Sequence, residues 1–256
     1  MILQYVTVSG PNEFTDIKGL AELMTEFKLG EIGIQVSDKQ SPAGGARIEW
    51  IHELVSYLRA SNTPMNAALH VNLGWVEALC HGRVDDTLKE LLELTDMYRQ
   101  PFFKRVQLNF KIGRDNVQED EANVMLPLIQ HILKRHFILS HNESNRCLIA
   151  KLYLQDLKFD CLFDASFGQG VLPEERPWPA FNDLLQGYAG GLTPDNVSSE
   201  LDKIAKAATI GSHVGRVYID AQKGLEDENG HLSLDKAHDY LENATAWYRN
   251  YLMPKQ

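Results

Sequence analysis

The chain has 256 residues, of which 44% are hydrophobic and 23% charged, a balance typical of a globular protein with a sizeable core. The formal net charge of −10 argues against a nucleic-acid binder, because no basic stripe is available to neutralise phosphates, although it leaves room for a local cationic pocket. No apolar run is long enough to cross a bilayer, and the first residues lack the charged region and cleavage site of a signal peptide. We therefore expect a cytoplasmic protein that binds neither membrane nor nucleic acid.

The cysteines give no sign of a metal site or a disulfide framework. Cys80, Cys147 and Cys161 are odd in number and have no metal-ligand spacing. Reduced thiols, most of them buried, are expected, and neither a metal nor a cofactor is predicted.

Apolar, β-branched runs alternate with segments of helical period along the whole chain. Strands are predicted at 2–8, 32–36, 65–71, 106–110, 137–140, 159–165, 184–188 and 217–221. Helices are predicted at 16–27, 48–60, 84–98, 121–134, 143–155, 193–208 and 234–251. With no linker and no repeat, this alternation predicts an α/β protein, a (β/α)8 TIM barrel in which residues 1–256 form a single domain. A doubly wound open sheet is the alternative.

The stretch LLQGYAGGLTPDNV at 184–197 predicts a phosphate site. Gly190 and Gly191 follow a strand and let backbone N–H groups approach a ligand without Cβ obstruction. Thr193 is a plausible helix N-cap, and Pro194 suits the first helical position. Barrels of this class commonly bind phosphate after their seventh and eighth strands. The alternative is a tight strand-to-helix turn without a ligand.

Polar residues gather at the predicted carboxyl ends of the strands, where the active site of such a barrel lies. They are Ser9, Gln35, Ser37, Asp38, His70, Asn72, Gln107, Asn109, His141, Asp164, Asp220, Gln222 and Lys223. Asp164 follows an apolar run and suits a general acid with a raised pKa; a capping role for the following loop is the alternative. His70 and His141 read first as structural residues.

Three stretches near the C-terminus, FDCLFDASFGQG, YAGGLTPDNV and VYIDAQKGLEDENG, resemble motifs of phosphoribosylanthranilate isomerase. VQLNF and the Ser41-Pro42 pair resemble motifs of the same family more weakly. The resemblance implies an Amadori rearrangement of a phosphorylated aminoaldose, with Asp164 as the general acid. Ser9, before Gly10, stands where the family has its catalytic Cys, and serine is a poor base without an activating partner.

The resemblance is uneven along the chain. Ala43 replaces the family Arg, with Arg47 one helical turn on, and Asn109 replaces the strand-four His. Lys223 replaces the Ser of the strand-eight motif, whereas Asp220, Gly224 and Glu226 are kept. The phosphate half is thus retained, and the half that holds the anthranilate carboxylate is altered.

The sequence therefore predicts a site on three sets of residues. The catalytic residues are Asp164 and Ser9; the phosphate-binding residues are Gly190, Gly191, Lys223 and Gly224; the substrate-binding residues are Gln107, Asn109, Arg47, His141 and Asp220. The predicted partner is a phosphorylated sugar-type metabolite. A related lyase or epimerase with His141 or Lys223 as base, and a non-catalytic phosphometabolite binder, are the alternatives. The loop 166–182 is either a lid or a surface insertion, and the oligomeric state is left open.

Overall fold

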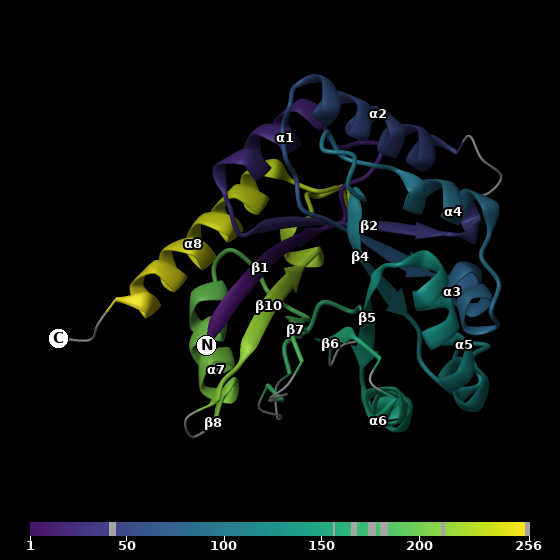
Figure 1. The fold of residues 1–256 in the computed structure, drawn as a ribbon. Coiled ribbons are helices and arrows are strands. Elements are labelled where there is room, and N and C mark those ends of the chain that lie inside the picture. Colours follow the sequence, from purple (N-terminus) through teal and green to yellow (C-terminus); the bar gives the residue numbers. More distant parts are fainter. Residues whose placement is uncertain are drawn as a thin grey trace. The chain divides into compact units, whose positions relative to one another are not determined.

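The computed structural model describes residues 1–40, 45–155, 157–164, 168–173, 178–179, 184–210 and 213–253 (Figure 1). Eight strands close into a barrel in the order β1-β10-β7-β6-β5-β4-β3-β2, which confirms the predicted (β/α)8 class. The barrel strands are β1 (Ile2–Ser9), β2 (Gly30–Ser37), β3 (Ala67–Asn72), β4 (Phe103–Asn109), β5 (His136–His141), β6 (Phe159–Asp164), β7 (Gln186–Ala189) and β10 (Arg216–Ala221).

Helices follow the strands in sequence, as the alternation of periods predicts. They are α1 (Ile17–Glu26), α2 (Ala46–Ala60), α3 (Leu73–Cys80), α4 (Asp86–Glu93), α5 (Glu119–Leu133), α6 (Arg146–Leu154), α7 (Val197–Ala207) and α8 (Leu234–Leu252). None of the helices described is both long and apolar enough to span a bilayer.

The chain divides into two compact units, one of Met1–Ile32 with Leu162–Gln256, and one of Gly33–Cys161. We call them the terminal unit and the central unit. That all residues form one domain stays a prediction.

In the terminal unit, β1 and β7 both pair in parallel with β10. Thr7 lies opposite Asp220, so Ser9, two residues after Thr7, points to the same face as Asp220. Tyr218 lies opposite Gly187, where any side chain would overlap the tyrosine ring. This glycine is therefore required for packing.

In the central unit, β4 lies between β3 and β5, again in parallel. His70 pairs with Gln107, and Asn72 pairs with Asn109. Since side chains two apart share a face, Arg105, Gln107 and Asn109 line one face of β4 beside His70 and Asn72 of β3. The register thus places a row of polar groups on two neighbouring strands.

The structure corrects several predicted boundaries. The helix expected at 84–98 is only α4, because Asp85 caps its start and the chain turns back at Thr95 to bridge Pro101. α3 was not predicted, since it begins directly after β3 with no turn residue between them. α7 starts at Val197 rather than 193, and a short pair of strands, β8 (Thr209–Ile210) and β9 (His213–Val214), was missed.

Candidate functional site

Ser9 and Asp220 form the centre of the terminal unit's polar site. Ser9 ends β1, and its Oγ donates a hydrogen bond to Asp220 Oδ1 at 2.6 Å. Both residues are buried, with 3% and 7% of their surface exposed. A buried carboxylate is stabilised by such a donor, so the serine has the partner that the sequence could not reveal.

Tyr240 of α8 responds to the same carboxylate. Burial, and then the charge of Asp220, raise the pKa of Tyr240 well above its usual value. The phenol of Tyr240 therefore stays neutral at neutral pH.

Asp164 ends β6 and is half-buried, and its Oδ2 accepts a hydrogen bond of 2.5 Å from the N–H of Gly168. This contact is the loop-capping arrangement that was the alternative to a general acid. The contact involves one of the two carboxylate oxygens, and the general-acid role stays a prediction.

The loops after β6, β7 and β10 meet in the terminal unit. Gly191 lies against the backbone of Val171 and Leu172, and Gly170 lies against the side chain of Lys223. Lys223 Nζ donates to the carbonyl of Gln169 at 3.2 Å. The glycine pair and the lysine are therefore brought to one group of loops, as the phosphate prediction requires.

Backbone conformation and close packing also explain why glycine occupies these positions. Gly190 and Gly191 adopt φ values of +102° and +71°, which side chains rarely tolerate. A Cβ on Gly224 would meet the carbonyl of Leu192. Their conformations thus suit both a phosphate cradle and the tight turn that was its alternative.

Thr193 and Asn196 together hold the start of α7. Asn196 Oδ1 accepts from the N–H of Thr193 at 2.9 Å, and its Nδ2 donates to the carbonyl of Gly191 at 2.8 Å. Thr193 Oγ1 accepts from the N–H of Asn196 at 3.3 Å, which is the kind of contact predicted for it, although α7 itself begins at Val197 with Asn196 before it. The two side chains fix the turn that carries the glycine pair.

Trp178, within the long loop after β6, packs as a core residue. It is 4% exposed, meets Phe163 and Tyr188 edge-on, and donates from Nε1 to Glu200 at 3.1 Å. Residues 165–167, 174–177 and 180–183 of this loop lie outside the described residues. The part around Trp178 is anchored to β7 and α7.

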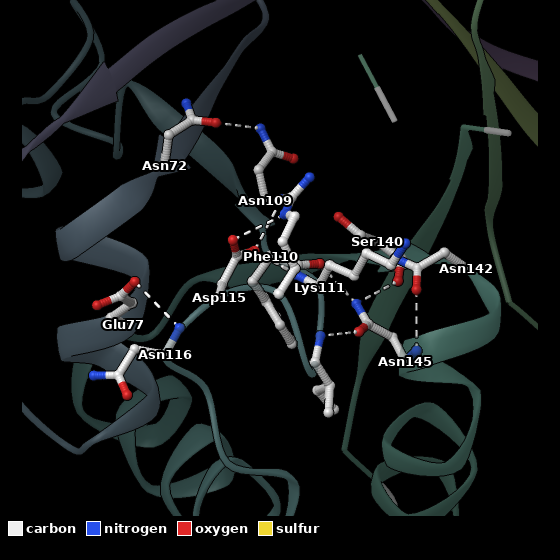
Figure 2. A network of polar contacts seen from close by, with 12 residues as sticks. Asn72, Glu77, Asn109, Phe110, Lys111, Asp115, Asn116, Ser140, Asn142 and Asn145 are labelled. Atoms are coloured by element: carbon white, nitrogen blue, oxygen red, sulfur yellow. Dashed lines mark hydrogen bonds and ion pairs between the residues drawn. The ribbon is translucent and has the colours of Figure 1, made fainter. Parts of the chain in front are cut away.

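In the central unit, three amides form a hydrogen-bonded chain. Gln107 Nε2 donates to Asn109 Oδ1 at 2.9 Å. Asn109 Nδ2 in turn donates to Asn72 Oδ1 at 3.0 Å (Figure 2). Gln107 and Asn109 were predicted as substrate-binding residues, and the structure brings them together. Asn72 was noted only as a polar strand end, because pairing across strands is invisible in the sequence.

Asn145 ties the loop after β4 to the end of β5 (Figure 2). Its Nδ2 donates to the carbonyls of Phe110 and Ser140, and its Oδ1 accepts from Ile112 N–H at 3.0 Å. The side chain is 1% exposed and uses every group it has. It holds the loop beside the amide chain in place.

A charged cluster includes Arg105, which precedes Gln107 on the same face of β4. Arg105 Nη1 meets Asp160 Oδ2 at 2.9 Å with both side chains buried, and His136 Nε2 meets Asp160 Oδ1 at 2.8 Å. Burial and the charge of Arg105 lower the pKa of His70 to about 3, so that imidazole is neutral at neutral pH. His70 is therefore not a base that cycles near pH 7.

Of the other two predicted substrate-binding residues, Arg47 has a contact with the backbone, and His141 is placed by its strand. Arg47 of α2 donates from Nη1 to the carbonyl of Gln35 at 2.9 Å. His141 ends β5 and is half-buried. Ala43, where the family has its Arg, lies outside the described residues.

Among the described residues, one group has the composition of a metal site: His238, Asp239 and Glu242 on the surface of α8. All are partly or fully exposed, and exposed acidic groups commonly cluster without an ion. The absence of a metal stays a prediction.

No protein-family model matches the sequence, and no curated protein does. Solved structures do match. TrpF from Jonesia denitrificans aligns with a TM-score of 0.54 and 16% identity over 96% of this chain and 98% of that chain. A phosphoribosyl anthranilate isomerase in complex with reduced 1-(o-carboxyphenylamino)-1-deoxyribulose 5-phosphate gives 0.53 and 17% over 96% and 100%. The fold resembles that of these isomerases.

At such identities the likeness to phosphoribosylanthranilate isomerase shows the fold alone. A glycoside hydrolase family 30 xylanase from Clostridium acetobutylicum also aligns, with a TM-score of 0.51 and 11% identity over 94% of this chain and 70% of that chain. Since one barrel serves unrelated reactions, the chemistry must be argued from the side chains.

Proposed function

We propose that the protein is an isomerase of the phosphoribosylanthranilate isomerase type, acting on a phosphorylated sugar-type metabolite. The observation that carries the proposal is the hydrogen bond from Ser9 to the buried carboxylate of Asp220. The carboxylate would be a proton acceptor beside Ser9, the position where this chain lacks the thiol of the family pattern. The isomerase that holds a ribulose 5-phosphate derivative supports the substrate class.

In the proposed reaction Asp164 donates a proton to the ring oxygen of the sugar. The ring C–O bond breaks as the amino nitrogen forms a C=N bond, which gives the Schiff base. Asp220 then removes the proton from C2. The C2–H electron pair forms a C1=C2 bond while the C=N pair returns to nitrogen, which gives the enol-amine. Loss of the C2 hydroxyl proton and protonation of C1 convert the enol-amine to the ketone. Ser9 acts as a positioning residue that orients Asp220 through its hydrogen bond.

The phosphate group is assigned to the loops after β7 and β10. Gly190, Gly191 and Gly224 would present backbone N–H groups, and Lys223 would add positive charge. A crystal grown with sulfate should hold the anion within hydrogen-bond reach of these groups. An ion bound only elsewhere, or amides turned away from the loops, would count against the assignment.

The direct test is turnover of phosphoribosylanthranilate, followed by its loss of fluorescence, with complementation of an isomerase-deficient strain. Asp164→Asn can still accept the hydrogen bond from the N–H of Gly168, but it removes the proton donor. It should therefore lower kcat by roughly two to four decades. Ser9→Ala should cost less, because it removes only the positioning contact. Equal losses in the two variants would mean that Ser9 itself reacts.

A non-catalytic phosphometabolite binder is the second candidate. A buried serine that satisfies a buried carboxylate is also an ordinary structural pair, which favours this candidate. Tight binding of inorganic phosphate without turnover of any phosphorylated aminoaldose would establish it.

A further inference from the structure

The amides of β3 and β4 form a chain whose hydrogen-bond direction is fixed at one end. Asn72 Nδ2 donates to the backbone carbonyls of Val36 at 3.3 Å and of His70 at 3.0 Å. A carbonyl oxygen can only accept, so the NH₂ group of Asn72 must lie on this side. Its Oδ1 therefore faces Asn109.

The orientation of the Asn72 amide fixes the orientation of the next two amides. Asn109 must donate from Nδ2 to Asn72 Oδ1, as the contact drawn in Figure 2 shows. Asn109 Oδ1 is then turned to Gln107, which supplies the donor Nε2. Reversing either amide would set two acceptors or two donors against each other. The chain must end on an acceptor, Gln107 Oε1.

That terminal acceptor is buried and has no hydrogen-bond partner among the residues that the structure describes. Gln107 as a whole is 4% exposed. An unsatisfied buried acceptor costs folding free energy, and each such group calls for an explanation. Turning the Gln107 amide over would satisfy nothing, because Asn109 Oδ1 would lose its donor. The missing partner must bring a hydrogen.

We propose that Gln107 Oε1 is a ligand-binding acceptor that selects a neutral hydrogen-bond donor, a hydroxyl or N–H group, and rejects a carboxylate or phosphate oxygen. His70, which pairs with Gln107 across the strands, is neutral and adds no cation that could hold an anion. This assignment rests on the proposed function only in the choice of a sugar phosphate as probe. Gln107 Oε1 would therefore bind a polyol in preference to an aromatic carboxylate.

The direction of the chain can be tested without a ligand. In Gln107→Glu the new carboxyl faces Asn109 Oδ1, which accepts a hydrogen bond only from the protonated form. Its pKa should therefore be higher than in the double variant Gln107→Glu/Asn109→Leu. His70 and Arg105 are present in both variants, so their effects cancel. A lower or equal pKa, from the pH dependence of urea unfolding, would overturn the fixed direction.

The ligand class is tested in crystals of the whole protein soaked with D-ribose 5-phosphate. A sugar hydroxyl within hydrogen-bond distance of Gln107 Oε1 is expected. In Gln107→Met, affinity for the sugar phosphate should fall about tenfold, the usual worth of one such contact to a buried polar group, with affinity for inorganic phosphate unchanged. A phosphate oxygen at Oε1, an ordered ligand that leaves Oε1 bare, or unchanged affinity in Gln107→Met would overturn the proposal. These outcomes do not depend on turnover, so they are separable from failure of the isomerase reaction.

Discussion

At the scale of single residues, the buried carboxylate of Asp220 is the feature on which the proposed reaction depends. Asp220→Asn keeps the shape and can still accept from Ser9, but it removes the proton acceptor. We expect kcat on phosphoribosylanthranilate to fall by roughly two to four decades, with KM changed little. Steady-state kinetics check this. A parent-like kcat in Asp220→Asn would place the base elsewhere.

Gly187 is a residue-scale test of packing. A methyl group there would overlap the ring of Tyr218, a fully buried side chain. Gly187→Ala should lower the free energy of unfolding by roughly 3 kcal/mol, the upper range for overpacking. Gly113→Ala is the control, since a Cβ there would meet none of the described residues within 4 Å beyond its chain neighbours, and only its φ of +83° is strained. Urea titration should show the control losing only about 1 kcal/mol. Similar losses would mean that Tyr218 moves aside freely.

At the scale of elements, Asn196 fixes the turn between β7 and α7. Asn196→Ala removes both of its contacts, to Thr193 N–H and to the Gly191 carbonyl. The expected loss is about 1 kcal/mol, or a Tm lower by roughly 2–4 °C. Asn196→Asp is the matched control, because it retains the acceptor for Thr193. If the turn binds phosphate, affinity for inorganic phosphate should fall in the order parent, Asn196→Asp, Asn196→Ala. An affinity for inorganic phosphate that is unchanged in both variants would mean that phosphate does not bind at this turn.

At the scale of the whole molecule, His70 predicts a loss of stability in acid. Its pKa falls from 6.5 to about 3 on folding, so the unfolded chain binds a proton that the folded chain does not. The stability that the neutral His70 contributes is fully present above pH 6.5 and is lost as the pH falls toward 3. Between pH 7 and pH 4 this one group should remove about 3 kcal/mol.

His70→Asn isolates that contribution, because it removes the titration and leaves every other group in place. Unfolding by urea at the two pH values should show the parent losing about 3 kcal/mol more than the variant. Equal losses would mean that the imidazole is protonated in the folded protein.

Local sequence patterns were enough to predict most of the strands and helices. Residues 2–8, 137–140 and 217–221 were predicted as strands from β-branched runs, and β1, β5 and β10 lie there. The period of 3.6 likewise placed α2, α5 and α8. Local signals failed where a boundary depends on contacts. α4 ends early because Thr95 bridges Pro101, and α7 begins at Val197, after a turn that Thr193 and Asn196 hold together.

The sequence by itself determined the class of fold and the residue types at the strand ends, because both follow from periodicity and from chain order. It named Ser9, Asp220, Gln107 and Asn109, yet it could not pair them. Asp220 lies 211 positions from Ser9, and Asn109 lies 37 from Asn72. Only strand register brings such side chains into hydrogen-bond reach. The tertiary structure therefore decided that the serine has a carboxylate partner, and that the amide chain ends on an acceptor, because direction in a hydrogen-bond chain is set by the groups at its far end.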